Sequence, residues 1–327
     1  MPDLKTCIGQ FTLLRRASGT VWGEVTRRKA PHKPILLMAV LDLIARGVIT
    51  TPVVDVTGDL VELNDLFNLY WRRVVSVGRS SSIAFPFSRL HNEPFWKLIA
   101  KPEHAVSDAV IAKTTTVSYL RTYALGARID EDLFAIMQTE SGRTTLREAL
   151  LQSCFSEEAQ LALLEQAVVN QGAFDYELML EKQAHQPLVK EVLETNSYKP
   201  AVRDQGFRRM VVSTYDHRCA LCGIRIVTPE GHTVVEAAHI VPWSESRNDD
   251  IRNGMALCRL CHWGFDEGML GVSINYQVIT ASSIGLAPNF AGSLQTLTGR
   301  AIIQPGDTAL RPAQEYLGEH RHRWKLK

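Results

Sequence analysis

The chain has 327 residues, of which 45% are hydrophobic and 22% are charged, and its formal net charge at pH 7 is +1. These values are typical of a globular protein with room for about two domains, and they exclude a highly charged or low-complexity chain. Residues 1–5 lack the basic start and apolar run of a signal peptide, and the longest apolar stretch, 35–49, is too short to span a bilayer. We therefore expect a cytoplasmic protein without a membrane segment.

The first part of the chain is organised around an apolar helix. A short helical region that ends near Arg16 comes first, and the predicted helix over 35–46 follows, with Pro34 at its start and Gly47 at its end. Because this helix has little polar surface, we expect it to be the central buried helix of its domain. His32 and Lys33 stand at its N-terminus, where the helix dipole favours a phosphate.

The next elements are a β-type passage around 53–56 and a helix over 64–73. A loop over 77–82 then leads into the aromatic-proline step Phe85-Pro86. Small hydroxyls, an arginine and an aromatic ring can line a DNA-contacting loop, so we take Arg79 and Ser82 as candidate contacts from their position in the loop. Core aromatics beside an ordinary turn are the alternative interpretation.

The middle of the chain is predicted to be helical. A capping-box pattern at 145–148 predicts the start of one helix, and Ser156 predicts the start of another that ends at Gly172. A further helix over 176–186 stops at Pro187, and the polar residues 187–202 are interpreted as a connector.

The last part of the chain is predicted to begin with a helix over 203–215. This helix would offer Arg208 and Arg209 to a DNA backbone. Near the end of the chain, residues 270–280 predict a β-hairpin with Asn275 in its turn.

Two Cys-x-x-Cys pairs are the least ambiguous chemical signal in the sequence. They consist of Cys219 with Cys222 and of Cys258 with Cys261. Two such turns supply the four thiolates of a structural zinc site. Disulfides or a redox pair are the alternatives, and without a secretory context zinc is favoured. The other two cysteines, Cys7 and Cys154, are interpreted as buried thiols.

The residues between the cysteine pairs carry the candidate catalytic groups. A β-type run over 233–240, ended by Pro242, places His239 near the end of a strand. A polar loop leads to Asn253-Gly254, and residues 255–265 predict a helix. His262 and Asp266 are four residues apart, so they share a helix face and can hold one metal ion.

This order of residues resembles the HNH (ββα-metal) endonucleases, in particular the group with Ala-Ala-His-Ile-x-Pro, then Asn-Gly, then His-x-x-Phe-Asp-x-Gly. The resemblance implies that His239 is the general base, that Asn253 orients it, and that His262 binds a catalytic divalent cation such as Mg²⁺ or Mn²⁺. Many such enzymes have an Asp ligand where this chain has Ala238. Asp266 is therefore our candidate second ligand, and Glu236 is a weaker one.

A second resemblance covers roughly residues 8–165. The segments 32–37, 67–71, 85–90 and 95–96 are similar to the sulfur-binding domain of phosphorothioate-dependent type IV restriction endonucleases. In that family a basic surface binds the DNA backbone, and a small apolar pocket receives the sulfur that replaces a phosphate oxygen. The resemblance matches His32 and Lys33 to the basic pair, and Phe85 and Pro86 to the pocket wall.

With a net charge of +1, any surface that binds nucleic acid has to be local. Basic residues cluster at Arg15-Arg16, Arg27-Arg28-Lys29, His32-Lys33, Arg72-Arg73, Arg208-Arg209 and residues 320–327. Each cluster alone is better interpreted as a solvated face. Beside a nuclease core, phosphate contact becomes the better interpretation.

The sequence thus predicts an α+β protein with a mixed α/β DNA-reading domain over 1–165, a helical connector over 166–202, and a ββα-metal domain with a structural zinc on four cysteines over 203–327. We expect a restriction endonuclease that acts on double-stranded, phosphorothioate-modified DNA, and cutting both strands would call for a homodimer. One alternative is an HNH enzyme directed by a modified base such as methylcytosine. A second alternative is a non-catalytic DNA-binding protein whose fold is held together by a structural zinc.

Overall fold

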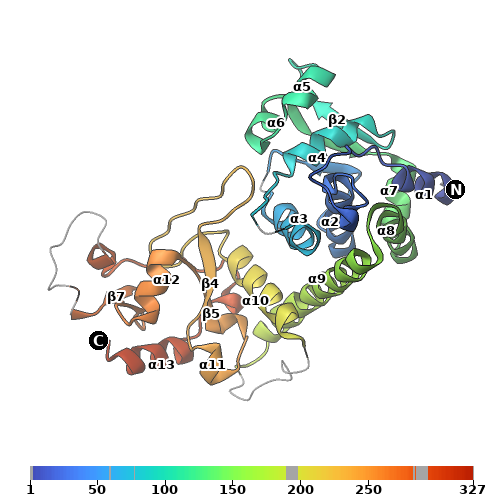
Figure 1. Cartoon of the computed structure of the whole chain (residues 1–327). Coiled ribbons are helices and arrows are strands. Elements are labelled where there is room, and N and C mark those ends of the chain that lie inside the picture. The colour runs from blue at the N-terminus through green and yellow to red at the C-terminus, as the bar shows by residue number, and fades with distance from the viewer. Residues whose placement is uncertain are drawn as a thin grey trace. The chain divides into compact units, whose positions relative to one another are not determined.

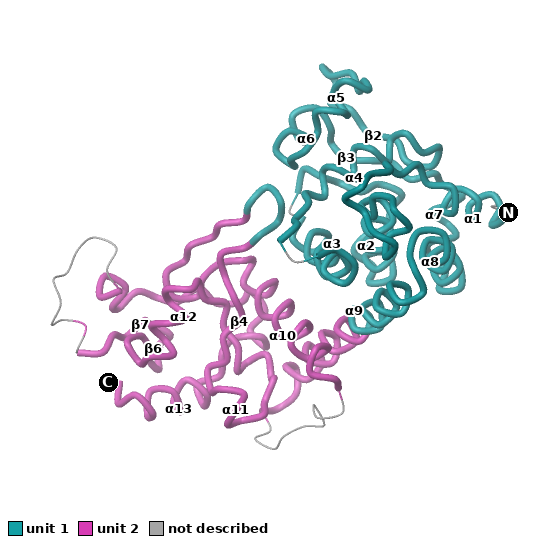
Figure 2. Tube along the Cα trace, viewed as in Figure 1, with its two compact units in different colours: residues 1–171, 228–232 teal, residues 172–227, 233–327 magenta. Residues whose placement is uncertain are grey.

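The computed structural model describes residues 3–58, 60–76, 78–188, 198–282, 284 and 294–326. These residues divide into two compact units (Figures 1 and 2). The N-terminal unit comprises Met1–Gln171 with Thr228–His232, and the C-terminal unit comprises Gly172–Val227 with Thr233–Lys327. Residues 189–197 of the predicted connector, Val77 of the predicted contact loop and Lys327 lie outside the described residues. The predicted domain boundaries at 165 and 202 stay predictions.

The N-terminal unit is built around α2 (His32–Arg46), and every side chain of α2 from Lys33 to Ile44 is buried. This confirms the predicted central helix, which starts three residues earlier than expected because Pro34 fits the first turn of a helix. Gly47 ends it in the left-handed region with φ 79°. Figure 1 shows α3 (Val61–Val74) and α8 (Glu140–Cys154) on either side of α2.

A small antiparallel sheet with the order β1-β3-β2 completes this unit. Its central strand has a glycine at a point of close approach, since a Cβ on Gly126 would lie 2.5 Å from the carbonyl oxygen of Val54. The strands are β1 (Val53–Asp55), β2 (Trp96–Ala100) and β3 (Ala124–Ile129). The remaining helices are α1 (Leu4–Thr12), α4 (Ala84–Arg89), α5 (Asp108–Lys113), α6 (Val117–Tyr123) and α7 (Glu131–Met137).

A buried carboxylate joins the helices of the N-terminal unit. Asp42 of α2 accepts hydrogen bonds from Tyr70 Oη at 2.6 Å, Arg147 Nη2 at 2.6 Å and Asn170 Nδ2 at 2.8 Å. Burial raises the pKa of the Asp42 carboxyl, while the charge of Arg147 and these hydrogen bonds act in the opposite direction. Because a buried charge is costly unless it is paired, this cluster fixes α3, α8 and the middle of α9 (Glu157–Ala184) around α2.

Several predicted helix ends were wrong. Helix α9 (Glu157–Ala184) begins after Ser156 as predicted but continues through Gly172. Gly172 is a packing position, because a Cβ there would lie 3.2 Å from Val202. The capping-box prediction at 145–148 was also wrong, since α8 begins at Glu140, where Thr139 Oγ1 accepts a hydrogen bond from Gly142 N. Helix α1 ends at Thr12, before Arg16.

The C-terminal unit has two antiparallel strands at its centre, and α10 and α12 flank them (Figure 1). The prediction of a helix from residue 255 was wrong for the first four residues, which belong to a strand. All five residues of this strand are buried, and a short, fully buried strand has the same apolar pattern as a buried helix. The elements are α10 (Pro200–Thr214), β4 (Val235–His239), α11 (Trp243–Ser246), β5 (Gly254–Cys258), α12 (Arg259–Asp266) and α13 (Gln314–Trp324).

The predicted hairpin near the end of the chain is confirmed as β6 (Leu270–Val272) paired antiparallel with β7 (Val278–Thr280). Asn275 lies in its turn, where its backbone N–H donates to Ser273 Oγ at 3.3 Å.

In the described part of the chain, every helix is too short or too polar to cross a bilayer.

Candidate functional sites

Four cysteines of the C-terminal unit converge on one point. Cys219 and Cys222 lie on a turn after α10, Cys258 ends β5, and Cys261 lies in the first turn of α12. Their sulfur atoms all lie within 4.8 Å of one another, and those of Cys222 and Cys258 are 3.7 Å apart. A tetrahedral zinc with Zn–S bonds of about 2.3 Å requires sulfur atoms about 3.8 Å apart. The cluster therefore fits a structural zinc, and its four sulfur ligands leave no open position for catalysis.

The candidate base, His239, is the last residue of β4. Its ring stacks on Phe207 of α10, with the ring centroids 4.0 Å apart and an interplanar angle of 8°. Its Nε2 lies 2.9 Å from Asp249 Oδ1. An ionised carboxylate only accepts hydrogen bonds, so Nε2 is the donor, and in the neutral imidazole Nδ1 then keeps the lone pair. Within the described residues, Nδ1 has no hydrogen-bond partner.

Asp249 is the residue that sequence reasoning missed. It is 1% exposed, and its second oxygen accepts hydrogen bonds from Tyr176 Oη at 2.9 Å and Arg203 Nε at 2.8 Å. Burial opposes ionisation, but the hydrogen bonds from His239 and Tyr176 and the charge of Arg203 outweigh it and lower the pKa of this carboxyl. In the sequence Asp249 is one polar residue in a polar loop, and only the fold brings it back to His239.

Asn253 is fully buried and does not contact the His239 ring through any hydrogen bond of the described residues. Its Oδ1 accepts from Val241 N at 2.9 Å, and its Nδ2 donates to the carbonyl oxygens of Val241 at 3.1 Å and Asn248 at 3.0 Å. These bonds hold the two ends of the loop between β4 and β5. Asn253 thus positions the loop that carries Asp249, whereas Asp249 itself contacts the imidazole.

The predicted cation ligands lie on α12 and β4. His262 Nε2 is 3.4 Å from Asp266 Oδ2, and His262 Nδ1 is 3.5 Å from Glu236 Oε2. The carboxylate oxygens suit Mg²⁺ or Mn²⁺, and the imidazole nitrogen adds a ligand that softer divalent metals prefer. Within the described residues, the four cysteines are the one group of three or more convergent metal ligands. A catalytic cation held by His262 with Asp266 or Glu236 would take its remaining ligands from water and phosphate. Ala238, at the position of the usual Asp, is buried.

His239, His262 and Asp266 all line one cavity of about 340 Å³. Helix α13 forms another wall of this cavity with His320, Arg323 and Trp324. The structure requires the glycine of the His-x-x-Phe-Asp-x-Gly motif at its position. Gly268 has φ 66°, and a Cβ on it would lie 2.3 Å from the Trp324 ring.

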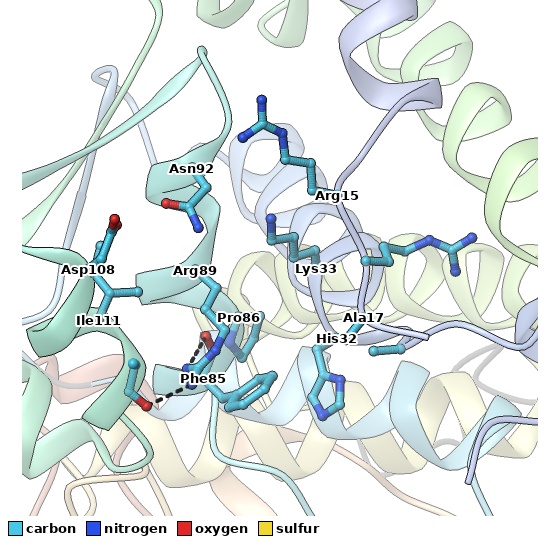
Figure 3. Close-up of a pocket in the computed structure, with 13 residues that line it drawn as sticks. Arg15, Ala17, His32, Lys33, Phe85, Pro86, Arg89, Asn92, Asp108 and Ile111 are labelled. Carbon is cyan, nitrogen blue, oxygen red and sulfur yellow. Dashed lines mark hydrogen bonds between the residues drawn. The ribbon is translucent and has the colours of Figure 1, made fainter. Parts of the chain in front are cut away.

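The N-terminal unit has a separate cavity of about 490 Å³, drawn in Figure 3. Its wall combines apolar and cationic side chains. Figure 3 shows the Phe85 and His32 rings toward one end of the cavity and the Arg15 and Lys33 side chains toward the other. Residues from α2, α4 and α5 line it together with the segment after α1, and they include Arg15, Arg16, Ala30, His32, Lys33, Phe85, Pro86, Arg89, Asn92 and Ile111.

The four residues matched to the sulfur-binding family, His32, Lys33, Phe85 and Pro86, all line this cavity. His32 packs against aromatic rings, with its ring centroid 4.8 Å from that of Phe85. Burial, and then the charge of Arg89, lower the pKa of His32 to about 4, so this side chain is neutral near pH 7. Phe85 and Pro86 lie on helix α4, where proline is accepted because it stands in the first turn.

The cations of this cavity differ in how they are held. Lys33 is buried and forms an ion pair with the buried Glu93. Arg89 donates to the carbonyl oxygen of Thr114 at 2.9 Å, and its guanidinium lies 3.7 Å from the centroid of the Phe85 ring. Arg15 is exposed, and its backbone N–H donates to Glu93 Oε1 at 3.1 Å. Arg15 therefore presents the most accessible of these three charges.

The other predicted DNA contacts lie outside both cavities. Arg79 donates to the carbonyl oxygen of Val21 at 2.8 Å, and Ser82 Oγ accepts from Ala84 N at 3.2 Å at the start of α4. Arg209 is buried and pairs with Glu177 at 2.9 Å, whereas Arg208 is exposed on α10. Arg209 is therefore engaged inside the C-terminal unit and does not offer its charge to a DNA backbone.

The C-terminal unit combines an antiparallel strand pair, the helix that follows it and a four-cysteine cluster, the arrangement that the sequence predicted for a ββα-metal domain. A scan against protein families agrees, because residues 219–273 match the family described as HNH endonuclease. The C-terminal unit therefore contains an HNH endonuclease domain, and this domain makes the protein a nuclease.

Two further comparisons add little to this assignment. A search of curated proteins found no match. Among solved structures, a chain described as a modification dependent TagI restriction endonuclease is similar, with 23% sequence identity and a TM-score of 0.27. The match covers 36% of this chain and 36% of that chain. A likeness at this TM-score carries no argument about the substrate.

The cysteine cluster makes a direct prediction about metal content. The purified protein should contain about one zinc per chain, and Cys258→Ser should lose it and lower the thermal stability of the C-terminal unit. Metal analysis and a thermal unfolding scan measure both quantities. The control is Cys7→Ser, which changes a buried thiol outside the cluster and should keep the zinc. Full zinc content in Cys258→Ser would contradict the assignment.

Proposed function

We propose that this protein is a restriction endonuclease that recognises phosphorothioate-modified DNA with its N-terminal unit and cleaves DNA with its HNH unit. The observation that carries the recognition half is the 490 Å³ cavity, whose wall combines apolar and cationic side chains. Sulfur is larger, more polarizable and more weakly hydrated than oxygen, so an apolar wall costs it less than it costs an ordinary phosphate oxygen.

The residues of this cavity fall into two groups, one for the sulfur atom and one for the phosphate charge. Phe85, Pro86 and Ile111 supply the apolar surface against which a sulfur atom packs. Because His32 is neutral and Lys33 is paired with Glu93, we assign the phosphate charge to the exposed Arg15, with Arg89 close to the Phe85 ring. The same cavity also has the volume to receive a modified base beside the Phe85 ring, and a binding comparison distinguishes the two ligands.

The catalytic half of the proposal assigns roles within the HNH site. His239 takes a proton from the attacking water through Nδ1, while Asp249 holds the Nε2–H side of the ring. His262, with Asp266 or Glu236, holds the divalent cation, which would stabilise charge on the phosphate. Asp249 acts through His239 and is therefore a positioning residue.

These roles predict a graded loss of cleavage. His239→Ala should lower kcat by about 10²- to 10⁴-fold, the usual contribution of a general base. Asp249→Asn should lower kcat by about 10- to 100-fold, by analogy with the effect of removing a carboxylate that orients a metal-bound histidine. KM should change little, because neither side chain is assigned to DNA binding. Initial rates over a range of duplex concentrations measure both constants.

A double variant tests whether Asp249 acts through His239. His239→Ala with Asp249→Asn should be no slower than His239→Ala alone, since a positioning residue has nothing left to position. Asp204→Asn is the matched control, because Asp204 is an exposed carboxylate on α10 outside the cavity. Equal effects of Asp249→Asn and Asp204→Asn would contradict the role of Asp249, and full cleavage by His239→Ala would contradict the base.

Recognition is tested by binding. Full-length His239→Ala, which should bind without cutting, is titrated with two duplexes of identical sequence, one of which carries a single phosphorothioate. We expect a preference of roughly tenfold or more for the sulfur duplex, which corresponds to about 1.4 kcal/mol. Phe85→Ser should remove most of this preference, because it replaces the apolar wall, whereas Arg79→Ala lies outside the cavity and should keep it.

Equal binding of the two duplexes would overturn the sulfur proposal and leave the nuclease assignment intact. The same titration with a methylcytosine duplex would then test the modified-base alternative.

A further inference from the structure

Helix α13 lies outside the residues that match the HNH family, yet it reaches the catalytic cavity. This helix carries most of the basic cluster over residues 320–327. Arg321 donates to the carbonyl oxygen of Val272 at 2.6 Å and serves the packing of the helix. Among the described residues of the cluster, Arg323 is the one arginine that lines the cavity shared by His239 and His262.

Contacts of His320 and Tyr316 hold α13, and with it Arg323, against the rest of the C-terminal unit. His320 stacks on Phe265 of α12 with the ring centroids 3.6 Å apart, and its Nε2 donates to the carbonyl oxygen of Phe265 at 2.9 Å. Burial lowers the pKa of His320 to about 4, so it adds no charge to the cavity near pH 7. Tyr316 Oη accepts a hydrogen bond from Asn248 Nδ2 at 2.8 Å, next to Asp249.

Arg323 is paired with Glu245 of α11. The Arg323 side chain is 34% exposed and the Glu245 side chain is 55% exposed. Solvent therefore screens the attraction between them, and another anion can replace Glu245 at little cost. A guanidinium forms two parallel hydrogen bonds with a phosphate as readily as with a carboxylate. A DNA strand entering the cavity would therefore compete directly with Glu245.

We propose that Arg323 binds a phosphate of the DNA strand that is cut, and that Glu245 holds this guanidinium until DNA displaces it. Arg323 is thus a substrate-binding residue supplied by α13, beyond the strand–strand–helix motif. The inference rests on the nuclease activity of the C-terminal unit and does not depend on sulfur recognition.

The test measures binding of an unmodified duplex to the full-length chain in a His239→Ala background, over a range of salt concentrations. Arg323→Gln should weaken binding about tenfold at low salt and reduce the slope of log Kd against log salt by about 0.9, the value for one lost phosphate contact. Arg323→Lys, which keeps the charge, should recover most of the slope. The matched control is Lys182→Gln, an exposed charge on α9 outside the cavity, which should leave the slope unchanged.

Glu245→Gln is expected to change the affinity for DNA in the opposite direction to Arg323→Gln. It frees Arg323, so it should tighten binding several-fold, and this gain should disappear when Arg323→Gln is also present. A gain that persists without Arg323 would show a general effect of charge and would overturn the proposed competition. Equal slopes for Arg323→Gln and Lys182→Gln would overturn the phosphate contact. Zinc content and the thermal midpoint of each variant show that it is folded.

Discussion

The contact between His239 and Asp249 is the interaction on which the catalytic unit depends. Asp249 is a buried carboxylate, and such a group is stable only when its hydrogen bonds are satisfied. Its partners come from three elements, Tyr176 on α9, Arg203 on α10 and His239 at the end of β4. Packing these elements together therefore orients the imidazole that the proposed mechanism uses. The same contacts stabilise the fold of this unit and set the geometry of its candidate base.

The cysteine cluster provides the second local constraint. Cys261 lies in the first turn of α12, one residue before His262. A zinc held by these sulfurs would therefore fix the start of the helix that carries the predicted cation ligands. Helix α13 then forms another wall of the cavity, where Trp324 packs against Gly268. In this way elements from the ββα motif and from beyond it enclose one site.

Sequence reasoning succeeded where the signal is local and failed where it depends on tertiary contacts. The cysteine spacing, the four-residue spacing of His262 and Asp266 and the end of α2 at Gly47 are local, and the structure agrees with each. Gly172 was mistaken for a helix end because its packing partner is distant in sequence. Asp249 was missed for the same reason. The charge state of His32 also depends on burial, which no local pattern reveals.

The central claim is that one chain couples recognition of a modified backbone to HNH cleavage. Its most direct test is to map the cuts that the wild-type protein makes, with Mg²⁺ or Mn²⁺, in a long linear duplex carrying a single phosphorothioate at a known position. The account predicts cuts near the sulfur and none in the unmodified duplex of the same sequence. Cuts of equal frequency in both duplexes, or cuts unrelated to the sulfur position, would contradict it.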